Sequence, residues 1–196
     1  EAVRSFGLVP GKATILIVGG SLGARTLNES VLGNLPLVKQ QNKVQFIWQT
    51  GKYYSEEIQA ELKRRGCPQN LVVMDFISDM RQAFAAADLI ISRAGAGSIS
   101  EFCLLGKPAI LVPSPNVAED HQTKNALSLV QKDAALYVTD ADARRSLLPL
   151  AINTVSDHSR LEVLSFNIKK LARPNAASDI ADEVIKLAEA YQGKTK

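Results

Sequence analysis

Short apolar runs alternate with segments of helical period along most of the chain. Several runs are apolar throughout instead of alternating with polar residues, which is typical of strands covered by helices on both faces. Strands that alternate with helices indicate right-handed crossovers between parallel strands. The pattern therefore predicts an α/β fold, a Rossmann-like doubly wound parallel sheet of about six strands. The predicted strands cover residues 14–18, 44–48, 71–74, 89–91, 109–112 and 135–138.

The segments between these strands carry apolar residues at helical spacing, which predicts helices with one buried face. Three such faces are expected: Leu27, Val31 and Leu35; Ile58, Leu62 and the stem of Arg65; and Ala126, Leu127 and Val130.

The pattern changes after the sixth run, where helices follow one another without strands. Asp142 is expected to cap a helix that ends near residue 154, and Ser159 one that ends near residue 171. Pro174 then breaks the chain, and a final amphipathic helix follows. We expect residues 1–10 to end a connecting segment, residues 11–175 to form the domain, and residues 176–196 to be a helix and tail of that domain. The apolar face of the final helix is Ala177, Ile180, Ala181, Val184, Ile185 and Ala188.

The composition of the 196 residues is that of an ordinary globular protein, with 46% hydrophobic and 22% charged residues. A net charge of +3 is too small and too evenly spread to indicate nucleic acid binding. No apolar run approaches the roughly 20 residues that span a bilayer, and the start resembles no signal peptide. Cys67 and Cys103 have no metal-type spacing, so we expect reduced thiols in a cytosolic protein, with Cys103 in the core. Because the chain begins with Glu1, we expect it to be one domain of a longer protein.

In a doubly wound sheet, ligands lie beyond the carboxyl ends of the strands. The loop after the first run is Gly19–Ala24, with three glycines and the hydroxyl of Ser21. It resembles a dinucleotide fingerprint only weakly, because the glycine spacing differs and the second strand does not end in an acidic residue. The glycines either serve a ligand or only permit a tight turn between strand and helix.

A second turn of small residues, from Arg93 to Glu101, follows the fourth run. A helix that begins here would offer unpaired N–H groups to an anion, so the turn predicts a phosphate site. Ser98 and Glu101 match the capping-box pattern S-x-x-E and could simply satisfy the start of the helix. Alternatively, Ser98 contacts the phosphate and the Glu101 carboxylate accepts from two ribose hydroxyls. The sequence favours neither over the other.

Two further loops carry polar residues. In residues 75–80, Phe76 and Ile77 are expected in the core and Asp79 as a helix cap, although an apolar pair could also bracket a flat base. After the fifth run, prolines stiffen a loop and a helix begins near Asp120 with polar residues suited to a polyhydroxylated ligand. The D-x-D of residues 140–142 resembles a metal motif, but it follows the last strand, where a cap is the better interpretation. We therefore predict no metal site.

Taken together, these loops resemble the C-terminal domain of the MurG family of peptidoglycan N-acetylglucosaminyltransferases. The resemblance covers nearly the whole chain and keeps the order and spacing of four motifs. They are G-G-S-x-G-A at residues 19–24, F-I-x-x-M at 76–80, A-D-L-x-I-S-R-A-G-A at 87–96 and D-H-Q-x-x-N-A at 120–126.

The resemblance implies one half of a GT-B glycosyltransferase, with the donor UDP-N-acetylglucosamine held mainly by this half. Ile77 would meet the uracil edge through its backbone, and Met80 would flank the base. Glu101 would hold the ribose hydroxyls. The remaining contacts would be Ser21, Ala96, Gly97 and Ser98 around the diphosphate, and Gln122 and Asn125 on the sugar with His121 nearby.

The family transfers this sugar, with inversion and without an essential metal or cofactor, to an undecaprenyl-linked muramyl pentapeptide. The family's glycine-rich motif with its reacting-centre histidine belongs to an N-terminal half that this chain lacks, so no catalytic residue is expected here. Gly97-Ser98 stands where many relatives have a bulkier residue followed by Thr, which keeps the hydroxyl. The chain alone is expected to be inactive, and the whole enzyme peripheral on the inner face of the bacterial membrane, mainly through the missing half.

Two alternatives stay open. The chain could be a free-standing subunit of a dolichol-type UDP-N-acetylglucosamine transferase that needs a membrane partner. It could also be a non-catalytic nucleotide-binding domain. In the full enzyme, the final helix would pack partly on the absent half, and the isolated chain would then expose apolar surface or self-associate.

Overall fold

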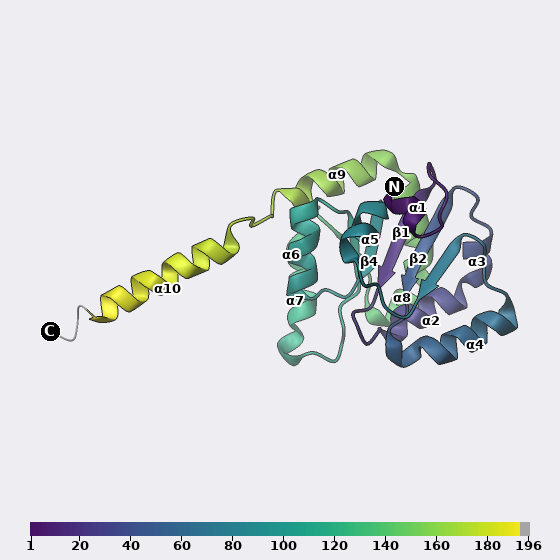
Figure 1. The fold of residues 1–196 in the computed structure, drawn as a ribbon, viewed down its shortest axis with the longest axis horizontal. Coiled ribbons are helices and arrows are strands. Elements are labelled where there is room, and N and C mark those ends of the chain that lie inside the picture. Colours follow the sequence, from purple (N-terminus) through teal and green to yellow (C-terminus); the bar gives the residue numbers. More distant parts are fainter. Residues whose placement is uncertain (193–196) are drawn as a thin grey trace.

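A computed structural model describes residues 1–192 of the chain. At its centre lies a parallel sheet of six strands in the order β3-β2-β1-β4-β5-β6 (Figure 1). This is the order of a doubly wound fold, and its direction reverses between β1 and β4. The predicted α/β class and all six predicted strands are confirmed. The strands are β1 (Ala13–Val18), β2 (Val44–Gln49), β3 (Leu71–Met74), β4 (Leu89–Ser92), β5 (Ala109–Leu111) and β6 (Leu136–Tyr137).

Helices connect the strands and cover both faces of the sheet. Short 3-10 turns at Lys52–Tyr54 (η1) and Ala118–Asp120 (η2) precede two of them. The helices are α1 (Ala2–Ser5), α2 (Arg25–Gly33), α3 (Leu35–Lys39), α4 (Ser55–Arg65), α5 (Met80–Ala86), α6 (Ala96–Leu105), α7 (His121–Val130), α8 (Asp140–Ser156), α9 (His158–Lys169) and α10 (Ala176–Gln192).

The side chains of β1 divide between two hydrophobic layers. Ile15 and Ile17 pack into the layer formed with α2, α3, α4 and α8. Leu16 and Val18 point to the other face, where α5, α6 and α7 pack. Figure 1 shows the two groups of helices on opposite sides of the strands. Burial on both faces is the reason that the strands are apolar throughout.

Two of the predicted helix faces need correction. The residues Leu27, Val31 and Leu35 are all buried, but they belong to two helices because the chain turns at Asn34. Pro36 enforces this break, since its ring would clash with the preceding turn of a continuous helix. On α7 the residue that joins Ala126 in the core is Leu129, whereas Leu127 is 40% exposed. The prediction for Ile58 and Leu62 is confirmed.

The starts predicted for the two helices after β6 are also wrong. Helix α8 is capped by Thr139, whose hydroxyl accepts a hydrogen bond of 3.1 Å from the amide of Asp142. Helix α9 is capped by Asp157, which accepts from the amide of Arg160 at 3.0 Å. Each predicted cap therefore lies inside the first turn of its helix, and a residue two or three positions earlier takes its role.

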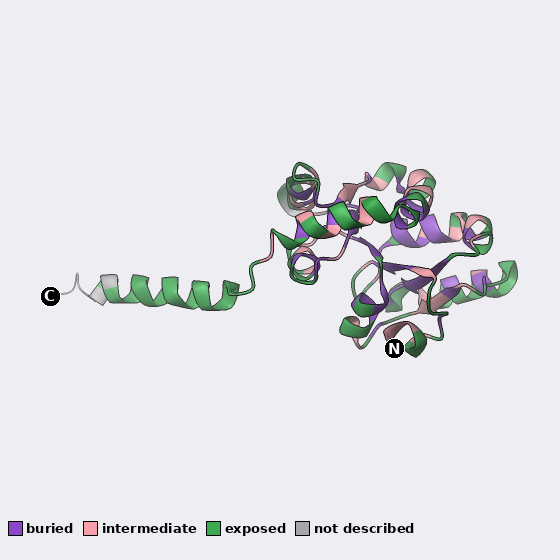
Figure 2. Cartoon of the chain, turned by 90° about the horizontal axis from the view of Figure 1, so that it is seen from above, coloured by how far each residue is buried: buried purple, intermediate pink, exposed green. Residues whose placement is uncertain are grey.

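Helix α10 extends away from the sheet and its covering helices (Figure 1). Its apolar residues are exposed, for example Ile180 at 65% and Val184 at 58%, and Figure 2 shows the described part of the helix as exposed throughout. The expected exposure of this apolar surface is confirmed. That α10 belongs to the same domain as the sheet, and that it packs on an absent half, stay predictions. Within residues 1–192, no helix combines the length and apolar character needed to cross a bilayer.

Candidate functional site

Most of the predicted site residues follow the carboxyl ends of the strands, and two of the loops meet where the strand order reverses. Val18 and Ser92 are register partners at the ends of β1 and β4. The turn after β1 (Gly19–Ala24) and the turn after β4 (Arg93–Ser98) therefore begin level with each other. Such a reversal point is where doubly wound proteins bind ligands.

The turn after β1 is packed against the end of β2. Gly23 has a positive φ of +85°, and a Cβ atom there would collide with the carbonyl oxygen of Thr50. Gly51, with a φ of +82°, meets the backbone of Gly23 in the same way. The side-chain amide of Gln49 donates to the carbonyl oxygen of Gly20 at 3.2 Å. Packing therefore requires glycine at positions 23 and 51, and Ser21 is exposed on the turn.

A buried polar chain fixes the backbone that this turn packs against. The indole N–H of Trp48 donates to Asn28 Oδ1 at 3.0 Å, and Asn28 Nδ2 donates to the carbonyl oxygen of Thr50 at 2.9 Å. The amides of Thr50 and Gly51 also donate to the carbonyl oxygens of Met74, the last residue of β3, and of Asp75. These hydrogen bonds hold the end of β2 against the end of β3, and the turn after β1 packs on the same segment.

The turn after β4 differs, because its helix begins without a side-chain cap. Helix α6 starts at Ala96, and its N-cap is Gly95, which has no side chain to offer. Ser98 and Glu101 lie inside the helix, so the capping-box interpretation is wrong. Ala96, Gly97 and Glu101 are exposed, and Ser98 is partly exposed. An uncapped helix start with exposed small residues is suited to bind an anion.

Two side chains of α7 hold this turn from the opposite side. Gln122 Oε1 accepts from the amide of Ala94 at 3.2 Å and from the amide of Ser114 at 2.9 Å. Asn125 Nδ2 donates to the carbonyl oxygen of Ala94 at 3.1 Å. The two predicted sugar contacts therefore shape the turn after β4.

An ion pair that sequence reasoning missed lies behind the turn. Arg93 Nη1 donates to the carbonyl oxygens of Val112 and Pro113 at 3.1 and 3.0 Å, and to Asp140 Oδ1 at 2.5 Å. Asp140 Oδ2 accepts from the hydroxyl of Thr26 at 2.9 Å. The available signal was a charged residue directly after a buried strand at the reversal point.

The loop after β3 holds the residues expected at a base. Asp79 caps α5 as predicted, and the hydrogen bond from the Gln82 amide lowers the pKa of its carboxyl. Ile77 is buried as predicted, and Met80 is partly buried against the same core. Phe76, expected in the core, is 43% exposed, with the ammonium of Lys52 5.3 Å from its ring centre. An exposed aromatic ring beside this loop is a further candidate for stacking on a flat ligand.

The loop before α7 carries two strained residues. Glu119 and Asp120 have positive φ values of 53° and 51°, which is costly for side chains other than glycine. Asp120 accepts from the hydroxyl of Thr123 at 2.6 Å, and His121 begins the helix with an exposed side chain. Strain of this kind is common where a loop is held for a ligand.

A metal site is not supported by the D-x-D pair. Asp140 is bound to Arg93 and Thr26, while Asp142 accepts from the hydroxyl of Thr139 at 2.7 Å. In the described part of the chain, no three metal-ligating side chains come together.

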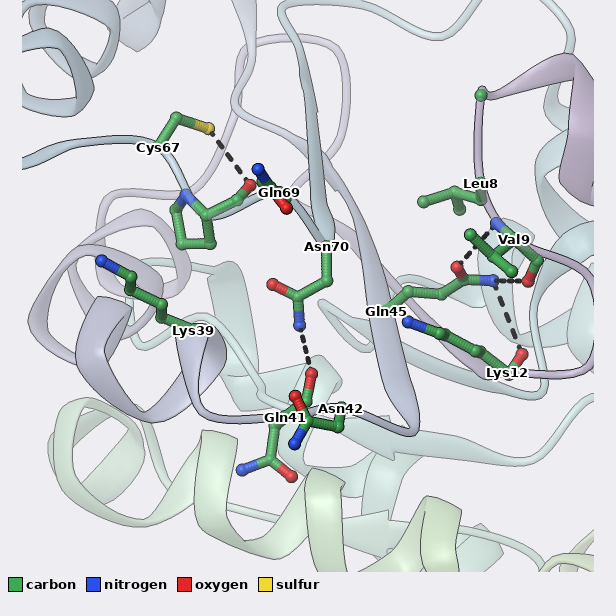
Figure 3. Close-up of a pocket in the computed structure, with 12 residues that line it drawn as sticks. Leu8, Val9, Lys12, Lys39, Gln41, Asn42, Gln45, Cys67, Gln69 and Asn70 are labelled. Carbon is green, nitrogen blue, oxygen red and sulfur yellow. Dashed lines mark hydrogen bonds between the residues drawn. The ribbon is translucent and has the colours of Figure 1, made fainter.

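A cavity of about 610 Å³ lies at the opposite edge of the sheet, by the amino ends of β1, β2 and β3 (Figure 3). Its lining includes Lys12, Lys39 and Asn70, and it contains none of the predicted site residues. The predicted residues instead follow the carboxyl ends of the strands, and most of them are wholly or partly exposed.

Comparison with known proteins gives consistent results. The family model described as "Glycosyltransferase family 28 C-terminal domain" matches residues 14–184. Over 189 residues, 96% of this chain, the sequence is 62% identical to a Bacteroides thetaiotaomicron protein. That relative is named UDP-N-acetylglucosamine--N-acetylmuramyl-(pentapeptide) pyrophosphoryl-undecaprenol N-acetylglucosamine transferase. A relative from Christiangramia forsetii with the same name is 46% identical over 187 residues, 95% of this chain and 50% of its own length.

Solved structures agree with the sheet order. The crystal structure of Acinetobacter baumannii MurG matches with a TM-score of 0.77 and 35% identity, over 89% of this chain and 52% of that protein. The C-terminal CMP-Kdo binding domain of WaaA, also from Acinetobacter baumannii, has a TM-score of 0.66 at 12% identity, over 88% of this chain and 95% of that one. The second likeness concerns the fold alone. The chain spans about half the length of the curated relatives that it matches.

Proposed function

Because the chain belongs to the glycosyltransferase family 28 C-terminal domain family, we propose that it is the donor half of a GT-B hexosyltransferase. The donor is UDP-N-acetylglucosamine and the acceptor a lipid-linked muramyl pentapeptide, as the names of its relatives state for them. In this proposal the chain binds the donor and turns over nothing by itself, since the reacting-centre histidine belongs to the absent half.

The observation that carries the proposal is the uncapped start of α6. Ala96, Gly97 and Ser98 form the first turn of this helix, where backbone N–H groups point out of the helix and no side chain caps them. The positive end of the helix dipole favours a diphosphate there. Ser98 adds a hydroxyl, and Ser21 offers a second one from the neighbouring turn after β1.

The positions of the loops support the other proposed contacts. Ile77 presents backbone after β3 for the edge of uracil, and Met80 flanks the base. Glu101, exposed on α6 and free of any capping role, accepts from the two ribose hydroxyls. Gln122, Asn125 and His121 at the start of α7 face the sugar.

This arrangement assists the departure of UDP. When the glycosidic bond to the acceptor forms, negative charge develops on the diphosphate oxygens. The N–H groups at the start of α6 are hydrogen-bond donors that are already oriented, so they stabilise that charge without reorganising. No metal is needed for this step if the helix and its hydroxyls supply the positive potential.

A calorimetric titration of the 196-residue chain against a panel of nucleotides tests the proposal. We expect saturable binding of UDP-N-acetylglucosamine and UDP, weaker binding of CMP and none of NAD. A chain that binds no UDP-sugar would contradict the donor site, and preferential binding of NAD would indicate an ordinary dinucleotide module.

The membrane enters the proposal only through the acceptor. A lipid-linked acceptor requires the whole enzyme to work at the inner face of the bacterial membrane. We assign the contact with the membrane to the absent half.

We propose that α10 also packs partly on that half, because Ile180, Val184 and Ile185 are exposed here. Sedimentation of the isolated chain should then show self-association that Val184→Lys reduces, whereas a strict monomer at high concentration would argue against it.

A further inference from the structure

Four loops at the carboxyl edge of the sheet are linked by one partly buried ion pair. The side chains of Arg93 and Asp140 are only 17% and 21% exposed, and their closest N–O distance is 2.5 Å. Arg93 follows β4 and reaches two carbonyl oxygens after β5, at Val112 and Pro113. Asp140 begins α8 after β6, and it also binds Thr26 on the helix that follows β1.

The ion pair lies next to a residue whose backbone is bound on both sides. The amide and the carbonyl of Ala94 are both bound, by Gln122 and Asn125 respectively. Arg93 is the residue before Ala94, so its side chain fixes the backbone at one end of the turn and α7 fixes the middle. Two residues later, the open first turn of α6 begins.

We propose that Arg93 and Asp140 are positioning residues, which orient the first turn of α6 so that its N–H groups converge on the donor's diphosphate. This inference rests on the proposed function, because it takes the UDP moiety as the ligand. In this proposal Arg93 acts through the backbone, because its guanidinium binds two carbonyl oxygens after β5 and the carboxylate of Asp140, and its side chain is only 17% exposed.

The choice of residues supports an orienting role over a purely stabilising one. A partly buried ion pair adds little net stability, because desolvation offsets most of the attraction. Its directional hydrogen bonds nevertheless set one geometry, which a planar guanidinium provides and an ammonium does not. Arg93→Lys therefore keeps the charge and removes the geometry.

The chain offers a matched control on the same two helices. Arg144 of α8 and Glu29 of α2 form an exposed ion pair that joins these helices without touching the turn after β4. Glu29→Gln breaks this pair as Asp140→Asn breaks the other. A general loosening of α8 from α2 should therefore appear in both variants.

The test measures affinity for UDP and for uridine in Arg93→Lys, Asp140→Asn and Glu29→Gln. In the ligand-free chains, the amide chemical shifts of Gly95, Ala96, Gly97 and Ser98 are compared. We expect both ion-pair variants to lose UDP affinity about tenfold, as for hydrogen bonds to a charged group, while uridine affinity changes less than about twofold. The four amide shifts should move in these variants and stay in Glu29→Gln.

The outcomes separate the inference from the proposed function. Wild-type affinity for UDP in both ion-pair variants would overturn the inference and leave the donor site intact. Equal losses for UDP and uridine would also overturn it, because the pair would then only support the fold. Absence of UDP binding by the unsubstituted chain would contradict the proposed function and this inference together.

Discussion

The turns after β1 and β4 begin side by side, and both are rich in small residues. The reason for glycine differs between them. In the first turn, a Cβ atom on Gly23 would overlap the backbone of Thr50, and one on Gly19 would overlap Ala24. In the second, a Cβ atom on Gly95 or Gly97 would meet nothing within 4 Å. The first turn is closed by protein packing, and the second is open toward solvent.

Glycines in a turn indicate a ligand only where packing does not require them. A glycine that packing requires says little about a ligand, because the fold alone explains it. A small residue with free space around it, on a helix start that no side chain caps, has no such explanation within the fold. The ligand signal therefore belongs to the turn after β4, although the turn after β1 looks more like a nucleotide motif.

The largest expected effect is on the closed turn. Gly23→Ala should lower the free energy of unfolding by about 3 kcal/mol or more, because a left-handed conformation and a backbone clash add together. Gly20→Ala is the matched control, with a similar φ of +83° but nothing within 4 Å. It should lose only about 1–2 kcal/mol. Equal losses in urea unfolding would show that packing against Thr50 is not what requires Gly23.

The second prediction concerns the open turn. Glu101→Ala should weaken UDP binding by about 1.5–3 kcal/mol, the range for hydrogen bonds to a charged group. Its melting temperature should not fall, because Gly95 and not Ser98 is the N-cap of α6. Titration with UDP and with 2′-deoxy-UDP tests the ribose contact itself. The wild type should bind UDP more tightly than 2′-deoxy-UDP, and this preference should disappear in the variant. Lost stability with unchanged affinity would restore a purely structural role for Glu101.

A smaller effect is expected at the hydroxyl of the same turn. Ser98→Ala should cost about 1 kcal/mol of UDP affinity, the typical value of a neutral hydrogen bond. Ser100→Ala is the control, because the Ser100 hydroxyl donates to the Ala96 carbonyl oxygen within the helix at 2.9 Å. Calorimetry should show a weaker complex for Ser98→Ala alone. If both variants bind UDP as the wild type does, the hydroxyl of Ser98 takes no part in the site.

The sequence allowed the strands to be predicted well and the local starts of helices less well. Continuous apolar runs report burial on both faces, so they located β1 to β6 to within a residue or two. The pattern S-x-x-E at Ser98 is purely local. The turn before α6 is instead held at Ala94 by two side chains, Gln122 and Asn125, which lie 28 and 31 positions later in the sequence. Phe76 and Arg93 depend on such distant partners as well. Periodicity carries no information on these contacts.

The smallest effect distinguishes the two turns most directly. Gly97→Ala should raise the free energy of unfolding by about 0.5–1 kcal/mol, because alanine favours a helix and a Cβ atom has free space there. UDP affinity should stay within about twofold, since in the proposed site the helix backbone, and not a side chain at this position, donates to the diphosphate. A glycine substitution that stabilises the open turn, beside Gly23→Ala that disrupts the closed one, would establish that only the turn after β1 owes its glycines to the fold. A destabilised Gly97→Ala would mean that the turn after β4 is closed too, and its small residues would then no longer indicate a ligand.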